Sequence, residues 1–274
     1  MPELPELEVV REVLQRRVVG TTIERVESVP PGGAIVVRDL THGDFGAALT
    51  GAAISAIARR GKFLVFSLPP LYLVLNPKLT GRLQLAARSG KRMAKTHLVL
   101  ALSNGAELRY VDQKTMGQLY LTRDLDTVPD FAGLGPEPFD VSRDEFRARL
   151  HPYRGEIKGI LTRGEFIAGI GNAYADEILW HARLHPYRKR TQLTSEEILR
   201  LYEAMQSTLR DAVAKVRAEM GERIHLKPRD FLAVHLKTGK PCPRCGTPIS
   251  LVGANQRITN FCRTCQPGGL IKGM

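Results

Sequence analysis

The sequence predicts an α+β protein of two domains, from three observations. Residues 1–127 hold many short apolar segments separated by Gly, Pro and Asn, which is typical of a β-sandwich or barrel. The stretch VPDFAGLGPEPFD at 128–140 is rich in proline and glycine, which indicates a linker. Helical periodicity and two CxxC pairs follow it. We therefore expect an N-terminal domain at 1–127, a helical domain at 141–236, and a metal-binding hairpin with a tail at 237–274.

The expected elements follow from residue spacing. A helix is predicted over 4–19, where apolar residues recur on one face and Gly20 is suited to end it. A short helix is expected at 43–49. Strands are predicted at 22–29, 53–58, 62–68, 71–75, 81–86, 96–102, 107–111 and 118–122. Later helices are predicted at 142–150, 172–182 and 195–219, the last from a start signal at Thr194 and a long apolar face.

The charge of the chain points to a polyanionic partner. The 274 residues carry a formal net charge of +12, with a pI of about 9.8. Residues 151–274 contribute +9, from 20 Lys and Arg against 11 Asp and Glu, and the rest contributes +3. This concentration favours nucleic acid over an unspecialised basic surface. No apolar run is long enough for a membrane span, and the acidic N-terminus does not resemble an export signal, so a cytoplasmic protein is expected.

The N-terminus, MPELPELE, has two interpretations. If Met1 is removed, Pro2 becomes a terminal secondary amine, and a large fraction of such amines can be unprotonated near neutral pH. Glu3 and Glu6 then lie within one helical turn as proton carriers. The alternative is an ordinary helix start, because proline and glutamate both favour the first turn.

The two CxxC pairs predict one structural zinc ion. Sixteen residues separate them, and they use every cysteine of the chain: Cys242, Cys245, Cys262 and Cys265. Four thiolates complete a tetrahedral zinc site and leave no position for water. Two disulfides are the alternative, but no export signal supports them. Arg257 lies between the pairs, where a rigid hairpin would present it to a phosphate or a DNA groove.

Two further motifs are weaker. The string GIGN at 169–172 lets Asn172 open a helix whose free amides can meet a phosphate, although an N-capped turn between helices gives the same string. In RRGKF at 59–63 the arginines can be solvated, whereas Lys62 begins an apolar strand, which leaves open a side chain directed at a cleft. His181 and His185 have i, i+4 spacing, but a helix end before Pro186 explains them better than a metal pair.

Four motifs in order resemble one family. They are PELPELE at 2–8, RRGKFL at 59–64, GIGNAYADE at 169–177 and QRITNFCRTC at 256–265. Together they resemble the formamidopyrimidine-DNA glycosylase family of base-excision repair, with the endonuclease VIII branch as the nearest relative; PELPE rather than PEGPE places the chain nearer the first group. The resemblance spans the whole chain. It implies an N-terminal β-sandwich, a helix-two-turn-helix module with a zinc hairpin, and duplex DNA gripped between them by a monomer.

The resemblance also implies residue roles. Pro2 would attack C1′ of the damaged nucleotide, Glu3 would carry protons and Glu6 would support it. Lys62, Asn172 and Arg257 match phosphate-gripping positions, and Tyr174 matches a position in the lesion pocket. The implied reaction removes an oxidised base through a Schiff base on the proline, then eliminates the 3′ and 5′ phosphates. The implied location is the bacterial cytoplasm, on the nucleoid.

The sequence departs from the family pattern at four DNA-facing positions. Asn76 stands where a histidine is common, and Leu79 replaces a methionine wedge while remaining apolar. Lys114 replaces an arginine that pairs with the orphaned base, which predicts looser discrimination of that base. Met116 replaces an intercalating phenylalanine.

A fifth departure concerns the lesion. Residues 217–240 are short for a loop that caps an oxidised purine, and 228–236 is predicted to be helical. Two alternatives therefore stay open: a same-family enzyme for oxidised pyrimidines or abasic sites, and a DNA-binding protein without catalysis.

Overall fold

The computed structural model describes residues 1–253 and 258–268, and the chain divides into two compact units. The first unit comprises residues 1–133 and 216–228. The second comprises 134–215 and the described residues from 229 onward. The segment predicted as a linker, 128–140, forms turns and irregular structure, and the first boundary between the units falls inside it.

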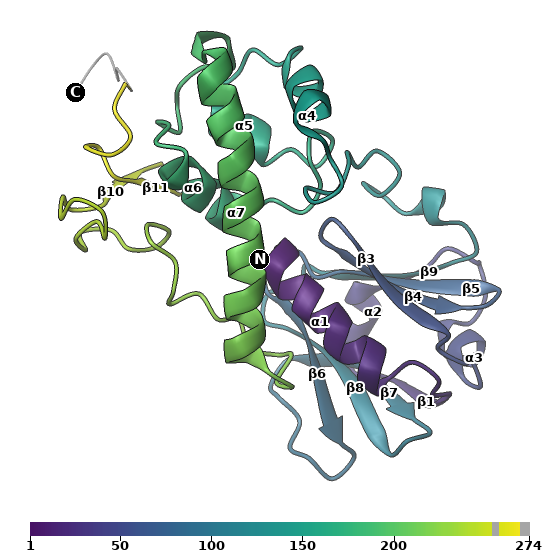
Figure 1. Cartoon of the computed structure of the whole chain (residues 1–274). Coiled ribbons are helices and arrows are strands. Elements are labelled where there is room, and N and C mark those ends of the chain that lie inside the picture. The colour runs from purple at the N-terminus through teal and green to yellow at the C-terminus, as the bar shows by residue number, and fades with distance from the viewer. Residues whose placement is uncertain (254–257, 269–274) are drawn as a thin grey trace. The chain divides into compact units, whose positions relative to one another are not determined.

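Two β-sheets form the body of the first unit (Figure 1). One has the order β1-β7-β8-β6 and is antiparallel. Its strands are β1 (Ile23–Ser28), β6 (Gly81–Ala87), β7 (Thr96–Leu102) and β8 (Ala106–Asp112). The other has the order β2-β9-β5-β4-β3. Its strands are β2 (Val37–Asp39), β3 (Ala56–Arg60), β4 (Phe63–Leu68), β5 (Leu71–Asn76) and β9 (Gln118–Thr122).

The two sheets form a sandwich. Apolar side chains from both, such as Phe66 and Leu73 of one and Leu83 and Leu108 of the other, line the same internal space. The predicted β-sandwich is therefore confirmed. Two small elements were not predicted, α2 (Gly32–Val36) and β2, whereas α3 (Phe45–Leu49) lies at the predicted short helix.

Helix α1 (Leu4–Arg17) packs on this sandwich at the edge strand β3. Its apolar residues Leu7, Val10, Val13 and Leu14 are buried, as the spacing predicts. The chain leaves the helix at Val18, and Gly20 then takes a φ of +85°, a conformation that glycine adopts at little cost.

The second unit is built around a helical core. Its helices are α4 (Arg143–Leu150), α5 (Ile157–Leu161), α6 (Asn172–His181) and α7 (Ser195–Met220), the last of which continues into the first unit. Phe146, Phe166, Tyr174 and Leu209 are buried at its centre. The strands β10 (Ser250–Val252) and β11 (Thr259–Phe261) form the hairpin of the cysteine motif. Within the described residues, no helix is long and apolar enough to cross a membrane.

The prediction of a helix over 228–236 is wrong. This segment holds turns only, and Leu236 has a φ of +58°. The main-chain amides of Ala233, Val234 and His235 donate to the Glu177 carboxylate over 2.8 to 2.9 Å. A tertiary partner thus takes up these three consecutive amides.

Candidate active site and zinc site

The N-terminal residues Pro2, Glu3 and Glu6 are buried at the start of α1. The main-chain NH of Glu3 donates to the Glu6 carboxylate over 2.8 Å, and the Glu3 side chain accepts from the main chain of Glu6. This is a capping box, which satisfies helix-start amides from both sides. It also fixes two carboxylates directly beside Pro2. The helix start and the acidic pair predicted from sequence are therefore the same structure.

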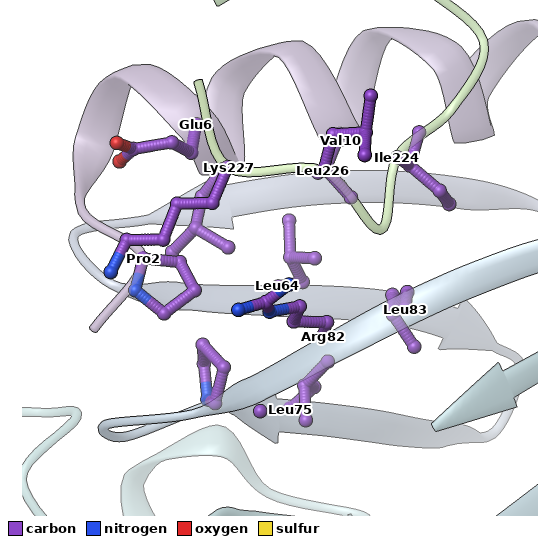
Figure 2. Close-up of a pocket in the computed structure, with 13 residues that line it drawn as sticks. Pro2, Glu6, Val10, Leu64, Leu75, Arg82, Leu83, Ile224, Leu226 and Lys227 are labelled. Atoms are coloured by element: carbon purple, nitrogen blue, oxygen red, sulfur yellow. The ribbon is translucent and has the colours of Figure 1, made fainter. Parts of the chain in front are cut away.

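Pro2 and Glu6 line an open pocket in the first unit, with about 360 Å³ of empty space when the solvent at its mouth is included (Figure 2). Its walls are mainly apolar, from α1, the sandwich and the segment after α7. Two cations also line it, Arg82 on β6 and Lys227. In Figure 2 the amino end of Lys227 is directed toward Pro2. Neither cation was predicted for this site; only the folding of residues 216–228 onto the sandwich brings Lys227 to the N-terminus.

Lys62 lies in the tight turn between β3 and β4, not in the strand itself as predicted. Gly61 before it has a φ of +55°, so the turn depends on glycine. Burial lowers the pKa of the Lys62 ammonium, Glu3 opposes that shift, and Lys78 adds to it. The structure thus brings Lys62 within electrostatic range of Glu3.

The loop that follows β8 presents Lys114 and Met116, both of which are exposed. Asp112, fully buried, accepts hydrogen bonds from the main-chain amides of Lys114, Met116 and Gly117 over 2.8 to 3.1 Å. Its side chain also accepts from Thr80 and Tyr110. Burial alone would raise the pKa of Asp112, but these hydrogen bonds hold it below its ordinary value. This aspartate was not predicted to have a role, although its carboxylate accepts hydrogen bonds from most of the loop.

Asn76 is the last residue of β5, and Leu79 lies in the turn between β5 and β6. Asn76 is buried, and its side-chain oxygen accepts from the amide of Lys78 over 3.2 Å. Lys78 has a φ of +45°. Leu79 is half-buried on the same turn. Their contacts with DNA stay predictions.

In the second unit, Asn172 and Lys158 hold the same main-chain carbonyl. Asn172 lies at the first position of α6, and its side-chain amide donates to the oxygen of Ile258 over 2.6 Å. Lys158 reaches that oxygen over 3.0 Å and forms a buried ion pair with Asp176 at 2.6 Å. Ile258 directly follows Arg257, which lies outside the described residues.

Tyr174 is fully buried in the helical core. The guanidinium of Arg229 lies 5.5 Å from the centre of its ring. Its predicted place in a lesion pocket stays a prediction. His181 and His185 lie near the end of α6, and among the described residues neither belongs to a group of three or more His, Cys, Asp or Glu side chains that could hold a metal ion. The ring of His185 packs on Phe261 instead, with 4.6 Å between the ring centres.

The four cysteines converge at the base of the β10–β11 hairpin. Their sulfur atoms all lie within 4.8 Å of one another. Zinc–sulfur bonds of about 2.3 Å in a tetrahedron place the sulfurs about 3.8 Å apart, so the cluster fits one zinc ion. The indole NH of Trp180 donates to Cys242 Sγ over 3.4 Å, and Arg244 lies 4.1 Å from the centre of the indole ring. The four cysteines, as thiolates, would hold the ion, and Trp180 links the site to α6.

The chain combines three features: a sandwich with a buried proline and an acidic pair at its start, a helical unit, and a four-cysteine hairpin. Together they define a class of two-unit, zinc-binding proteins. Three family models match the chain in that order. They describe the formamidopyrimidine-DNA glycosylase N-terminal domain at 1–119, its H2TH domain at 134–222, and a zinc finger found in FPG and IleRS at 239–268. The chain belongs to the formamidopyrimidine-DNA glycosylase family.

Curated relatives and solved structures agree with this membership. The formamidopyrimidine-DNA glycosylase of Symbiobacterium thermophilum is 39% identical, over 97% of this chain and 90% of its own. That of Pelotomaculum thermopropionicum is 36% identical, over 97% and 99%. The Lactococcus lactis Fpg in complex with DNA containing an abasic site has a TM-score of 0.85 at 31% identity, covering 97% of this chain and 100% of its own. A MutM in complex with DNA containing carbocyclic 8-oxo-G has a TM-score of 0.84 at 34% identity, with the same coverage.

Proposed function

We propose that this chain is a DNA glycosylase with AP lyase activity, which removes oxidised bases from duplex DNA. The observation that carries the proposal is the placement of Pro2 in the wall of a cavity, directly beside the Glu3–Glu6 capping box. Relatives that bind abasic-site and 8-oxo-G DNA support the substrate class.

In the proposed reaction the amine of Pro2, exposed after removal of Met1, attacks C1′ of the damaged nucleotide. The base leaves with the electron pair of its glycosidic bond and takes up a proton. The amine nitrogen loses its proton, the C1′–O4′ bond of the resulting aminal breaks, and O4′ takes up a proton as C1′ forms a double bond to the proline nitrogen. This iminium acidifies the C2′ hydrogen, and loss of that proton expels the 3′ phosphate with its electron pair. A second elimination then releases the 5′ phosphate. Attack requires a neutral amine and the proton transfers require a carrier.

The side chains around Pro2 suit these steps. Glu3 is the proposed proton carrier, and Glu6 holds its main chain in place. The ammonium of Lys227 is directed toward Pro2, and a neighbouring cation favours the neutral, nucleophilic form of an amine. The target nucleotide must leave the base stack to reach a cavity of this kind.

Phosphate binding is assigned to residues on both units. Lys62, near Glu3, supplies a cation on the first unit. On the second we assign it to Asn172 and to Arg257, which directly precedes Ile258 in the sequence; Asn172 and Lys158 both donate to the main-chain oxygen of Ile258. Leu79, Met116 and Lys114 are proposed to fill the gap left by the flipped nucleotide and to face the orphaned base. With four to five phosphates bound, the log–log slope of affinity against salt should be on the order of −4.

Relatives from bacteria support a place on the bacterial nucleoid, and we propose that the chain acts there as a monomer. The class of lesion also belongs to the proposal. Cleavage of 8-oxoguanine, formamidopyrimidine and thymine glycol in one duplex context separates an oxidised-purine preference from an oxidised-pyrimidine preference.

Borohydride trapping tests the mechanism. Wild-type protein should form a covalent adduct with duplex DNA that contains an abasic site, and Pro2→Gly should weaken it strongly. The matched control is protein that retains Met1, identified by intact mass, in which the proline nitrogen is an amide and cannot attack. Equal trapping by processed and Met1-retaining protein would exclude Pro2 as the nucleophile.

A further inference from the structure

Arg59, on the edge strand β3, contacts two parts of the first unit at once. Its Nε donates to Glu8 Oε2 on α1 over 2.6 Å. Its Nη1 donates over 3.1 Å to the main-chain oxygen of Gly61, in the turn that carries Lys62. The Arg59 side chain is only 7% exposed, so water competes weakly for these contacts.

Arg59 thus forms a bridge between Glu8 and Gly61, and each of these residues belongs to a part of the proposed active site. Glu8 lies on α1, whose first turn carries Glu3 and Glu6 and follows Pro2. Gly61 and Lys62 form the two-residue turn between paired residues Arg60 and Phe63. One guanidinium therefore links the helix of the proposed nucleophile to the turn of the proposed phosphate ligand.

A second arginine that contacts Glu8 allows the role of Arg59 to be tested by comparison. Arg11 also pairs with Glu8, through its other oxygen Oε1 over 2.6 Å. Arg11 lies on α1 itself, three residues after Glu8. Both arginines thus satisfy the carboxylate, and both help to hold the pKa of Glu8 below its ordinary value against burial, which raises it. Of these two described arginines, Arg59 is the one whose guanidinium also donates to the Lys62 turn, whereas the guanidinium of Arg11 donates to Glu8.

We propose that Arg59 is a positioning residue for imine formation, because it sets the placement of the Pro2 amine relative to Lys62. The inference rests on the proposed function. A nucleophile and a phosphate ligand act on the same nucleotide only if their relative placement is held to within a fraction of an ångström. A 1 Å misplacement costs about a hundredfold in rate.

The test compares Arg59→Met with Arg11→Met. Each variant removes one guanidinium from Glu8 and keeps an unbranched side chain. The measurement is the single-turnover rate of borohydride-trapped adduct formation at saturating abasic-site DNA, together with the DNA concentration for half-saturation. We expect Arg59→Met to form adduct at least about tenfold more slowly with half-saturation within about twofold of wild type. Arg11→Met should stay within about twofold of wild type in both.

Equal rates in the two variants would overturn the positioning role, since both disturb Glu8 alike. A loss in Arg59→Met that appears only as weaker half-saturation would overturn it too. If wild-type protein forms no adduct, the proposed function fails instead, which is a separate result.

A second variant covers the case in which Arg59→Met does not fold, as judged from thermal melting. Arg59→Lys keeps a charge for Glu8, but one ammonium without the planar fork cannot reproduce both contacts. We expect Arg59→Lys to form adduct at least about threefold more slowly than wild type, and more slowly than Arg11→Met. Its rate should still exceed that of an inactive protein. A wild-type rate in Arg59→Lys would contradict the bridge.

Discussion

The main-chain NH of Glu3 donates a 2.8 Å hydrogen bond to the carboxylate of Glu6, and the Glu3 carboxylate accepts one from the main-chain NH of Glu6. This exchange places two buried carboxylates next to Pro2. It also means that the start of α1 and the proposed proton carriers depend on each other.

Replacing Glu6 should therefore lower stability in a way that depends on hydrogen bonding. Glu6→Ala leaves the Glu3 amide without its acceptor and should cost about 1 kcal/mol, or about 2–4 °C in Tm. Glu6→Gln keeps an acceptor, since glutamine also serves in capping boxes, and is the matched control. Thermal melting of the two proteins decides: an equal loss in both would show that charge, not the cap, is what matters.

Lys62 should make stability depend on alkaline pH. Its pKa is lowered in the folded protein, chiefly by burial, so the unfolded chain binds this proton more tightly. Stability should therefore rise with pH from the folded pKa up to the ordinary lysine value near 10.5. Lys62→Met should remove this dependence, so its stability relative to wild type should fall as pH rises through that window. Urea unfolding of both proteins between pH 7 and 10 measures the difference, and parallel pH curves would contradict the prediction.

Asp112 should control the loop that carries Lys114 and Met116. Asp112→Ala leaves three loop amides without their acceptor, and we expect a loss of about 3 kcal/mol. The pKa of Asp112 is held down by these hydrogen bonds, so its contribution is present above the ordinary value of 3.8 and lost as pH falls through the folded pKa. Unfolding of wild type and Asp112→Asn from pH 7 to 3 tests this sign. Wild type should lose more stability toward acid than the variant does.

Lys114 should give weak discrimination of the base opposite the lesion. An ammonium lacks the bidentate fork of a guanidinium, so we expect similar excision rates opposite all four bases. Lys114→Arg should sharpen the preference several-fold, as each good bidentate pair is worth about 1–3 kcal/mol. Single-turnover excision in four duplexes measures both proteins. Strong rejection of adenine by the wild type would refute the prediction.

Metal removal should be visible through Trp180, the chain's one tryptophan. Its indole NH contacts Cys242 Sγ, so loss of zinc should alter its fluorescence emission. We expect one zinc ion per chain, released by chelation together with that change. Cys245→Ser should bind zinc more weakly, whereas Ser250→Ala on the same hairpin should not. Unchanged emission after complete metal removal would contradict the link between Trp180 and the site.

Much of the fold follows from local sequence pattern. Strands β7 and β9 lie at the predicted residues, and α1 and α7 have the predicted apolar faces, because alternation and helical spacing are local properties. The cysteine cluster follows from spacing alone. The family assignment, made from four short motifs, is confirmed by family models that match residues 1–119, 134–222 and 239–268.

The features that were missed depend on distant partners. Lys158 donates to the main-chain oxygen of Ile258, which is 100 residues away in the sequence. The helix predicted over 228–236 does not form because the Glu177 carboxylate accepts hydrogen bonds from three main-chain amides of that segment. Lys227 reaches the proline cavity only when the segment after α7 folds onto the sandwich. No local pattern contains these contacts.

The central claim is that the amine of Pro2 forms the covalent bond with DNA. Peptide mapping by mass spectrometry of the borohydride-reduced adduct tests it most directly, because it locates the attached sugar fragment on the chain. The account predicts attachment to the N-terminal peptide, at Pro2, with Met1 absent. Attachment to Lys62 or Lys227 instead would contradict it.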